Sequence, residues 1–193
     1  MKLAKAYTEK ETAKKLKDIW LSNKKLPSAV LLELLDPESY TQAKRLAEQA
    51  EYRKEKQALF HSYSKAPAPE ELLHLLNSED TKTLITTITG KKTGEIKAEA
   101  YSFGWKDYTL LHDKNRQKPS TDIILDLTEE WDEDARGHIV YTDGTGDYFR
   151  IPIRPNMLII AERKGNSQRY VEYINHKAGQ NKRHLIIGTH QKA

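Results

Sequence analysis

The residue types that most often carry chemistry are present in this sequence, but their spacing excludes several common sites. The chain has no cysteine, which excludes disulfide frameworks, thiolate zinc sites, iron–sulfur clusters and cysteine nucleophiles. Its seven histidines never show the His-x3-His spacing of a helical zinc site. The glycine segments 90–94 and 143–147 lack the spacing of a phosphate loop or a dinucleotide fingerprint, and each predicts a hairpin turn instead.

Charge and length set the broad class of the protein. The 32 cations and 28 anions leave a net charge of +4, and the basic excess lies in residues 161–193. This distribution keeps nucleic-acid binding open without requiring it. A chain of 193 residues predicts one domain with its own core. Apolar runs of about five residues predict no membrane span and no signal peptide, and the absence of thiols favours the cytoplasm.

The elements that must position any site change in character near residue 80. Residues 1–80 predict a helical support with one strand at 28–35. Helices are expected from Thr8, with Glu11 completing a capping box, after the Asp36-Pro37 cap, and over 69–77. Residues 81–190 predict a β core of short strands at 83–89, 95–103, 108–112, 121–128, 138–142, 148–153, 157–162, 170–174 and 184–187. We therefore expect a single domain, mainly β with supporting α-helices.

Residues 108–189 also carry an ordered set of segments that resembles a known family. The set comprises Tyr108-Thr-Leu-Leu-His112-Asp113, Thr121-Asp-Ile-Ile-Leu-Asp-Leu127, Glu130-Trp131-Asp132, Gly137-His-Ile-Val-Tyr141, Ile153-Arg-Pro155-Asn156-Met-Leu-Ile-Ile160, Tyr170-Val171 and Arg183-His-Leu-Ile-Ile-Gly188. It resembles the iron(II)- and 2-oxoglutarate-dependent oxygenases of the prolyl-hydroxylase type, closest to the branch that hydroxylates a ribosomal-protein proline. The resemblance covers about residues 28–190 and implies a double-stranded β-helix, a cupin-like jelly-roll barrel with an open mouth.

The resemblance also implies a metal site, and two of its three ligand positions are substituted here. Such a site needs two imidazoles and one carboxylate on one face of the metal. His112 matches the first imidazole, and Tyr108 lies where its hydroxyl could reach the cofactor. The carboxylate position holds Lys114 and the second imidazole position holds Arg169, while Arg183 matches the arginine that binds 2-oxoglutarate. Protonated Lys and Arg have no lone pair to offer a metal.

These substitutions predict a barrel interior rich in positive charge. We expect His112, Lys114, Arg169 and Arg183 to meet in one pocket, where buried cations require an anion or internal carboxylates. Asp122 and Asp126 are candidates for the carboxylates, because residues an even number apart share one face of a strand. The sequence does not tell whether that face points inward.

The preferred interpretation is an oxygenase-fold protein that has lost its iron site and binds an anionic small molecule or peptide. One alternative is an active 2-oxoglutarate-dependent dioxygenase with an atypical metal site, in which Asp113 and His176 join His112 and the cofactors are iron(II) and 2-oxoglutarate. A second alternative is a nucleic-acid or ribosome-associated binding module that uses the basic C-terminal segment. The substrate, the cofactor and the oligomeric state stay open.

Overall fold

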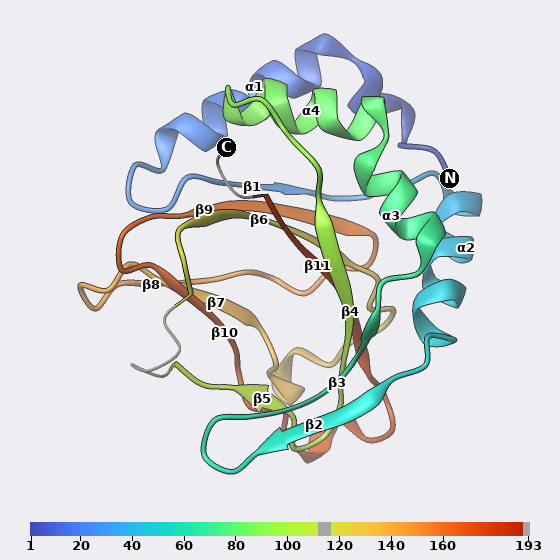
Figure 1. The fold of residues 1–193 in the computed structure, drawn as a ribbon, viewed down its shortest axis with the longest axis vertical. Helices are drawn as coiled ribbons and strands as arrows, with labels where there is room; N and C mark the ends of the chain where they lie inside the picture. Colours follow the sequence, from blue (N-terminus) through green and yellow to red (C-terminus); the bar gives the residue numbers. More distant parts are fainter. Residues whose placement is uncertain (112–116, 191–193) are drawn as a thin grey trace.

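A computed structural model describes residues 1–111 and 117–190 and places their strands in two antiparallel sheets (Figure 1). The larger sheet has the strand order β1-β9-β6-β11-β4-β3-β2, with β5 paired to β3, and the smaller sheet has the order β10-β7-β8. The strands are β1 (Ser28–Leu31), β2 (Arg53–Gln57), β3 (His61–Pro67), β4 (Lys97–Phe103), β5 (Tyr108–Thr109), β6 (Ser120–Asp126), β7 (Ile139–Thr142), β8 (Tyr148–Arg150), β9 (Met157–Arg163), β10 (Gln168–Val171) and β11 (Arg183–His190).

Four α-helices and three short 3-10 helices complete the described chain. They are α1 (Lys10–Ser22), α2 (Pro37–Glu48), α3 (Glu70–Asn77), α4 (Glu79–Thr89), η1 (Lys5–Thr8), η3 (Glu133–Ala135) and η4 (His176–Ala178). The α-helices lie on the outer side of the larger sheet (Figure 1), where their apolar stripes and one face of the sheet form a first core. No helix in residues 1–111 or 117–190 is both long and apolar enough to cross a bilayer.

A second core fills the space between the two sheets and defines the barrel interior. Because side chains alternate along a strand, β6 and β9 contribute to both cores. Ile123 and Leu125 of β6 belong to the helix-covered core, whereas Ile124 belongs to the interior core. Asp122 and Asp126 share the face of Ile124, so both carboxylates point into the barrel, and both are fully buried. The described strands thus form the predicted β-rich barrel with helical support.

Two local predictions in the helical region are wrong. Residues 83–89 belong to α4 and not to a strand, because Ser78 caps the helix through Thr81 N and Leu84, Ile85 and Ile88 form one buried stripe. The turn predicted at 90–94 is the end of that helix, where Gly90 takes the left-handed conformation (φ 69°) that favours glycine.

Residues 1–80 contain three strands where the sequence predicts one. Strands β2 and β3 form a hairpin, and all five side chains of β2 are exposed, so β2 has no apolar alternation to reveal it. The predicted strand 28–35 is limited to β1. The capping box at α1 is also wrong, because Thr8 Oγ1 donates to Lys5 O (2.8 Å) inside η1.

Two other local predictions are confirmed. Asp36 caps α2 by accepting from Ser39 N (2.8 Å), with Pro37 in the first turn. A hairpin connects β7 and β8, and Gly144 (φ 80°) and Gly146 (φ 108°) supply its positive φ angles.

Candidate functional site

Among the described residues, five charged side chains lie in the mainly apolar barrel interior, on three adjacent strands of the larger sheet and one strand of the smaller sheet. They are Asp122 and Asp126 of β6, Arg163 of β9, Arg169 of β10 and Arg183 of β11. Buried charges cost free energy unless they are paired and hydrogen-bonded. Their partners therefore decide what else the interior can bind.

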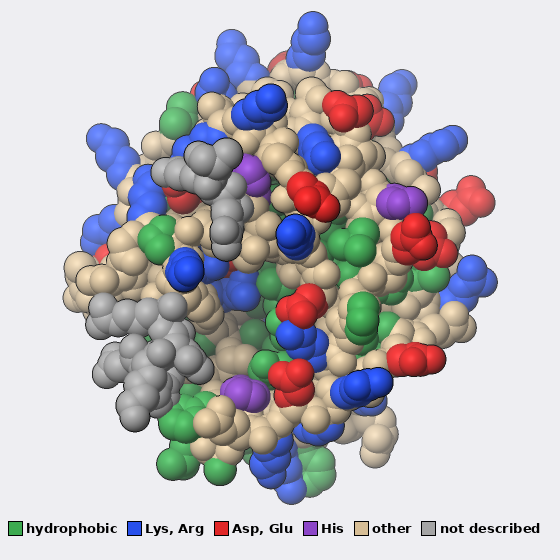
Figure 2. All heavy atoms as spheres, in the orientation of Figure 1, with side chains coloured by type: hydrophobic (Ala, Val, Ile, Leu, Met, Phe, Trp, Pro, Cys, Tyr) green, Lys and Arg blue, Asp and Glu red, His purple; other side chains and the backbone are tan. Residues whose placement is uncertain are grey.

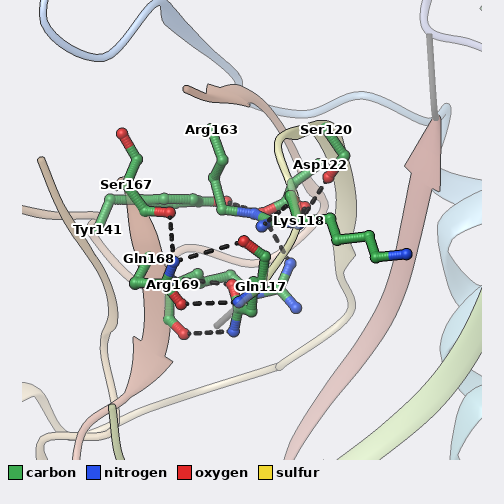
Figure 3. A network of polar contacts seen from close by, with 9 residues as sticks. All are labelled: Gln117, Lys118, Ser120, Asp122, Tyr141, Arg163, Ser167, Gln168 and Arg169. Carbon is green, nitrogen blue, oxygen red and sulfur yellow. Dashed lines mark hydrogen bonds and ion pairs between the residues drawn. The ribbon is translucent and has the colours of Figure 1, made fainter. Parts of the chain in front are cut away.

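Asp122 is the centre of the first group of interior charges (Figure 3). Arg163 donates to both of its oxygens, from Nε to Oδ2 (2.9 Å) and from Nη2 to Oδ1 (3.0 Å), and so forms a bidentate pair. The Tyr141 hydroxyl donates to Oδ2 (3.1 Å). Arg169 Nη1 lies 2.9 Å from the same oxygen, but it is a buried nitrogen with no aligned hydrogen-bond acceptor in the described chain. Two guanidinium groups thus share one carboxylate, which leaves a local charge of +1.

The protonation states of this group follow from burial and from the Asp122 charge. Burial, strengthened by the negative charge of Asp122, raises the pKa of Tyr141 well above its usual value, so the hydroxyl stays a donor. Burial opposes the charged form of Arg169, but attraction to Asp122 and smaller contributions from Tyr141 and Tyr101 together outweigh burial and raise the pKa of the guanidinium. Arg169 is therefore a permanent cation at this position.

Two glutamines and a threonine position the edge of β10 next to this group. The Gln117 side chain pairs with the backbone of Arg169, donating to its carbonyl (2.8 Å) and accepting from its amide (3.1 Å). Gln168 Oε1 accepts from the backbone N–H of Gln117 (2.9 Å; Figure 3). Two residues along the strand, Val171 N donates to Thr109 Oγ1 (2.7 Å). These contacts fix the backbone position from which Arg169 enters the barrel.

Asp126 and Arg183 form a second, separate group. Arg183 is 1% exposed and Asp126 is 0% exposed. Arg183 Nη2 donates to Asp126 Oδ2 and Nη1 donates to the carbonyl of Gly137. Asp126 also accepts from Thr128 N (3.0 Å). Asp122 and Asp126 are four residues apart on β6, or about 13 Å at the usual rise of a strand, so the two groups are distinct.

Aromatic side chains of β3 and β4 line the barrel next to the Asp122 group. Tyr63 packs against Tyr101 (ring centroids 5.3 Å apart) and Phe103 (5.8 Å), and all three contact the interior core. Burial, followed by nearby Glu55, raises the pKa of Tyr63 to about 12. Figure 2 shows that this side of the molecule is hollowed near its centre, where basic and hydrophobic side chains are visible inside the hollow. The barrel thus combines an aromatic wall with a cation that is only partly compensated.

The residues expected from the sequence fall into three sets. Arg169 and Arg183 both point into the barrel, but the structure pairs them with different carboxylates and does not bring them together. Tyr108 is half-buried on β5, with its ring 6.1 Å from that of Tyr173, and His176 is exposed in η4. The remaining predicted residues, His112, Asp113 and Lys114, lie outside the described residues.

Arg163 is the interior residue that the sequence reasoning missed. It is 5% exposed and makes the bidentate pair with Asp122, and it also donates to Ser120 Oγ (2.6 Å) and to the carbonyl of Lys118 (2.7 Å). The alternation of side chains along β9 could have predicted it, because Arg163 lies on the same face of the strand as the apolar interior residues Met157, Ile159 and Ala161.

The described interior does not fit an iron site. Its only carboxylates, Asp122 and Asp126, already bind arginine side chains. Within residues 1–111 and 117–190, no three His, Asp or Glu side chains come together as a metal site. Adjacent guanidinium groups would also repel a divalent cation.

Comparison with solved structures identifies the fold. No family model matches the chain, and no curated protein matches its sequence. A 2-oxoglutarate-Fe(II) oxygenase family oxidoreductase from Burkholderia pseudomallei superposes with a TM-score of 0.72 at 10% identity, covering 93% of this chain and 90% of that one. A Trichoplax adhaerens prolyl hydroxylase, solved with a peptide fragment of hypoxia inducible factor, gives a TM-score of 0.71 at 13% identity, with coverages of 95% and 94%.

A prolyl-4-hydroxylase from Pseudomonas putida gives a TM-score of 0.65 at 11% identity, covering 94% of this chain and 99% of that one. All three neighbours span nearly the whole chain, so the similarity is not limited to a few strands. The chain therefore has the double-stranded β-helix fold of the 2-oxoglutarate oxygenases, including prolyl hydroxylases, as the sequence resemblance predicts. At 10–13% identity, the comparison concerns the fold and not the reaction.

Proposed function

We propose that this protein uses the oxygenase fold for binding and not for oxidation, and that its ligand is an anionic small molecule or an acidic peptide side chain held at Arg169. The charge balance of the described interior carries this proposal. Three arginines are paired with two carboxylates, so one positive charge in a buried, aromatic environment has no full counterion. A monoanion with one carboxylate would neutralise it.

The ion pair between Asp126 and Arg183 is the second reason for proposing a protein that does not use 2-oxoglutarate. The resemblance assigns Arg183 to the distal carboxylate of 2-oxoglutarate, and in this chain the Asp126 carboxylate already binds that guanidinium. A dicarboxylate would have to displace a fully buried internal partner to reach it. Asp126 thus binds Arg183 in the way that the resemblance assigns to the distal carboxylate of 2-oxoglutarate.

Nucleic-acid binding is less well supported by the same residues. Residues 161–193 contain seven cations, but Arg163, Arg169 and Arg183 lie inside the barrel. Those three are not available to a phosphate backbone, so the basic excess of this segment is largely internal.

Calorimetry with the purified full-length chain tests the binding proposal. Benzoate is a suitable probe because it joins one carboxylate to a flat apolar ring, and an N-acetylated glutamyl peptide amide presents the same group from a peptide. We expect saturable binding of one or both, and no binding of neutral benzamide. Arg169→Gln should weaken binding about tenfold or more, the scale of a charge-assisted contact. The matched control Lys164→Gln removes an exposed cation and should leave affinity unchanged.

A second measurement tests the absence of catalysis. The protein is titrated with Mn²⁺ and with 2-oxoglutarate, and succinate is measured after incubation with iron(II), ascorbate and 2-oxoglutarate. We expect neither micromolar metal binding nor succinate. Metal binding together with succinate release that His112→Ala abolishes would overturn the proposal in favour of an active dioxygenase. Absence of binding by every carboxylate probe would overturn the anion site itself.

A further inference from the structure

A second polar site lies outside the barrel interior, where η3, η4 and the start of β7 meet β8. A cavity of about 390 Å³ is lined there by Arg136, His138, Arg150, Asn175 and Lys177, and by the two acidic residues of η3, Glu133 and Asp134. None of these residues belongs to the Asp122 or the Asp126 group. The cavity therefore calls for its own explanation.

His138 forms an oriented pair at this cavity. Its side chain is 8% exposed, and Nδ1 lies 3.0 Å from Glu172 Oε2. Glu172 Oε1 in turn accepts from Arg150 Nη2 (2.6 Å). With the Nδ1 proton directed to Glu172, Nε2 is the ring nitrogen left for a ligand. The carboxylate fixes the ring as it does in many histidines that bind ligands.

The cavity has more cationic than anionic groups free for a ligand. Glu133 binds Arg154 Nη1 (2.6 Å), and Asp134 binds Lys177 Nζ. Arg136, by contrast, has no ion pair among the described residues. Arg150 shares its one carboxylate with His138. The excess charge is positive, so the chemistry favours an anion.

The backbone of Arg136 is strained, and its surroundings hold it in that state. Its φ of 63° and ψ of −143° lie near a region populated almost only by glycine. Trp131 Nε1 donates to the Arg136 carbonyl (2.7 Å), and Arg136 N donates to Glu133 O (3.1 Å). Fold stability alone favours glycine here, so an arginine in this conformation points to a use for its side chain.

We propose that this cavity binds a phosphate group, either free phosphate or a phosphomonoester. Arg136 and Arg150 supply guanidinium donors, and His138 supplies a further donor when protonated. These groups come from the turn after η3, from the residue just before β7 and from β8, so they can surround a tetrahedral oxyanion.

Binding at this cavity depends on pH through His138. Four charged groups from different elements act on it: Glu172 after β10, Arg150 of β8, Arg183 of β11 and Glu133 of η3. Burial lowers the pKa of free His138, with smaller effects from the two arginines, while Glu172 opposes the shift. A bound dianion favours the protonated ring, so affinity rises as pH falls.

Calorimetry and histidine NMR with sulfate and phosphate probes test the proposal. Sulfate keeps its charge between about pH 5 and pH 8, whereas phosphate esters titrate near about pH 6, so the pH dependence of sulfate binding belongs to the protein. O-phosphoserine, compared with inorganic phosphate, distinguishes an esterified from a free ligand. We expect sulfate to shift the His138 ring signals and to bind more tightly at lower pH.

Three variants separate the site from a purely structural role. Arg136→Gly should weaken sulfate binding at least about tenfold while raising the unfolding temperature, because glycine relieves the strain. His138→Gln can still donate to Glu172 and should retain binding but lose its pH dependence. Arg53→Ala removes an exposed cation of β2 and should change neither property. Absence of saturable sulfate and phosphate binding below about 10 mM, or unchanged affinity in Arg136→Gly, would overturn the proposal.

Discussion

Replacing Asp126 with asparagine tests most directly how the charges inside the barrel stabilise the fold. Asp126 and Arg183 are both essentially inaccessible to solvent. Asparagine has nearly the same shape as aspartate, but its one amide oxygen can replace only one of the two acceptors that Asp126 offers to Thr128 N (3.0 Å) and to Arg183 Nη2. The substitution therefore removes the negative charge next to the Arg183 guanidinium and one of these two hydrogen bonds while leaving the volume of the side chain almost unchanged.

The expected effect is large because the remaining charge stays buried. Removing one partner of a buried ion pair costs about 3–5 kcal/mol. A change of 1 kcal/mol shifts the melting temperature of a domain of this size by about 2–4 °C, so Asp126→Asn should melt roughly 6–20 °C lower. The double variant Asp126→Leu/Arg183→Met removes both charges and should lie within about 2 kcal/mol of the wild type, since apolar replacement of a buried pair is often neutral.

Urea unfolding followed by circular dichroism measures these free energies, and a carboxylate titration adds a second readout. Asp126→Asn leaves Arg183 without a counterion, so adding 2-oxoglutarate should raise its melting temperature through ligand linkage by more than it raises that of the wild type. A loss below about 1 kcal/mol in the single variant would refute the reasoning. So would a double variant whose loss equals the sum of the two single losses.

Three further predictions concern other residues. Arg163→Met should destabilise the fold by about 1–3 kcal/mol in urea unfolding, because only Arg163 holds Asp122 with two aligned bonds. Arg169→Met should cost under about 1 kcal/mol, because the Arg163–Asp122 pair stays intact; equal losses would contradict this assignment. Burial, with a smaller effect of Lys182, lowers the pKa of His184 to about 4. Below about pH 6.5 the folded state therefore binds fewer protons than the unfolded state, and the free energy of unfolding should fall between about pH 6.5 and pH 4. His184→Gln should reduce this decrease in acid titrations. Gly188→Ala places a methyl group 2.8 Å from Ile96 Cγ2 and should lower the free energy of unfolding by about 1–3 kcal/mol; an unchanged midpoint would show that β11 shifts freely.

The sequence predicts the β core well wherever burial alternates or is continuous. Strands β6 and β9 are buried along their whole length, and their apolar runs identify them without a structure. Strand β2 is exposed along its whole length, so its pairing with β3 depends on backbone hydrogen bonds that leave no hydrophobic pattern. Residues 83–89 are rich in threonine and isoleucine, which favour strands, but the Ser78 cap and the buried stripe of α4 prevail.

The sequence identifies most charged residues of the candidate site, but it does not tell which carboxylate pairs with which arginine. Strand parity places Asp122 and Asp126 on one face, and the family resemblance selects Arg169 and Arg183. Which carboxylate meets which arginine depends on the spacing between β6, β10 and β11, which sequence order does not encode. Arg163 was missed because an arginine at the end of a strand is usually an exposed side chain.

The composition of the interior argues for a binding role beyond fold stability. Buried ion pairs are often no better for stability than well-packed apolar residues of similar volume. This barrel nonetheless keeps five charged side chains next to an apolar core that includes Ile124, Ile159 and Leu185. The Asp126–Arg183 pair is internally neutral, so stability alone would allow its replacement. The Asp122 group is not neutral, because Arg169 adds a charge that the fold does not compensate. A double variant lacking the Asp126–Arg183 pair should therefore bind benzoate as the wild type does, and a loss of binding in that variant would show that the two groups act as one site.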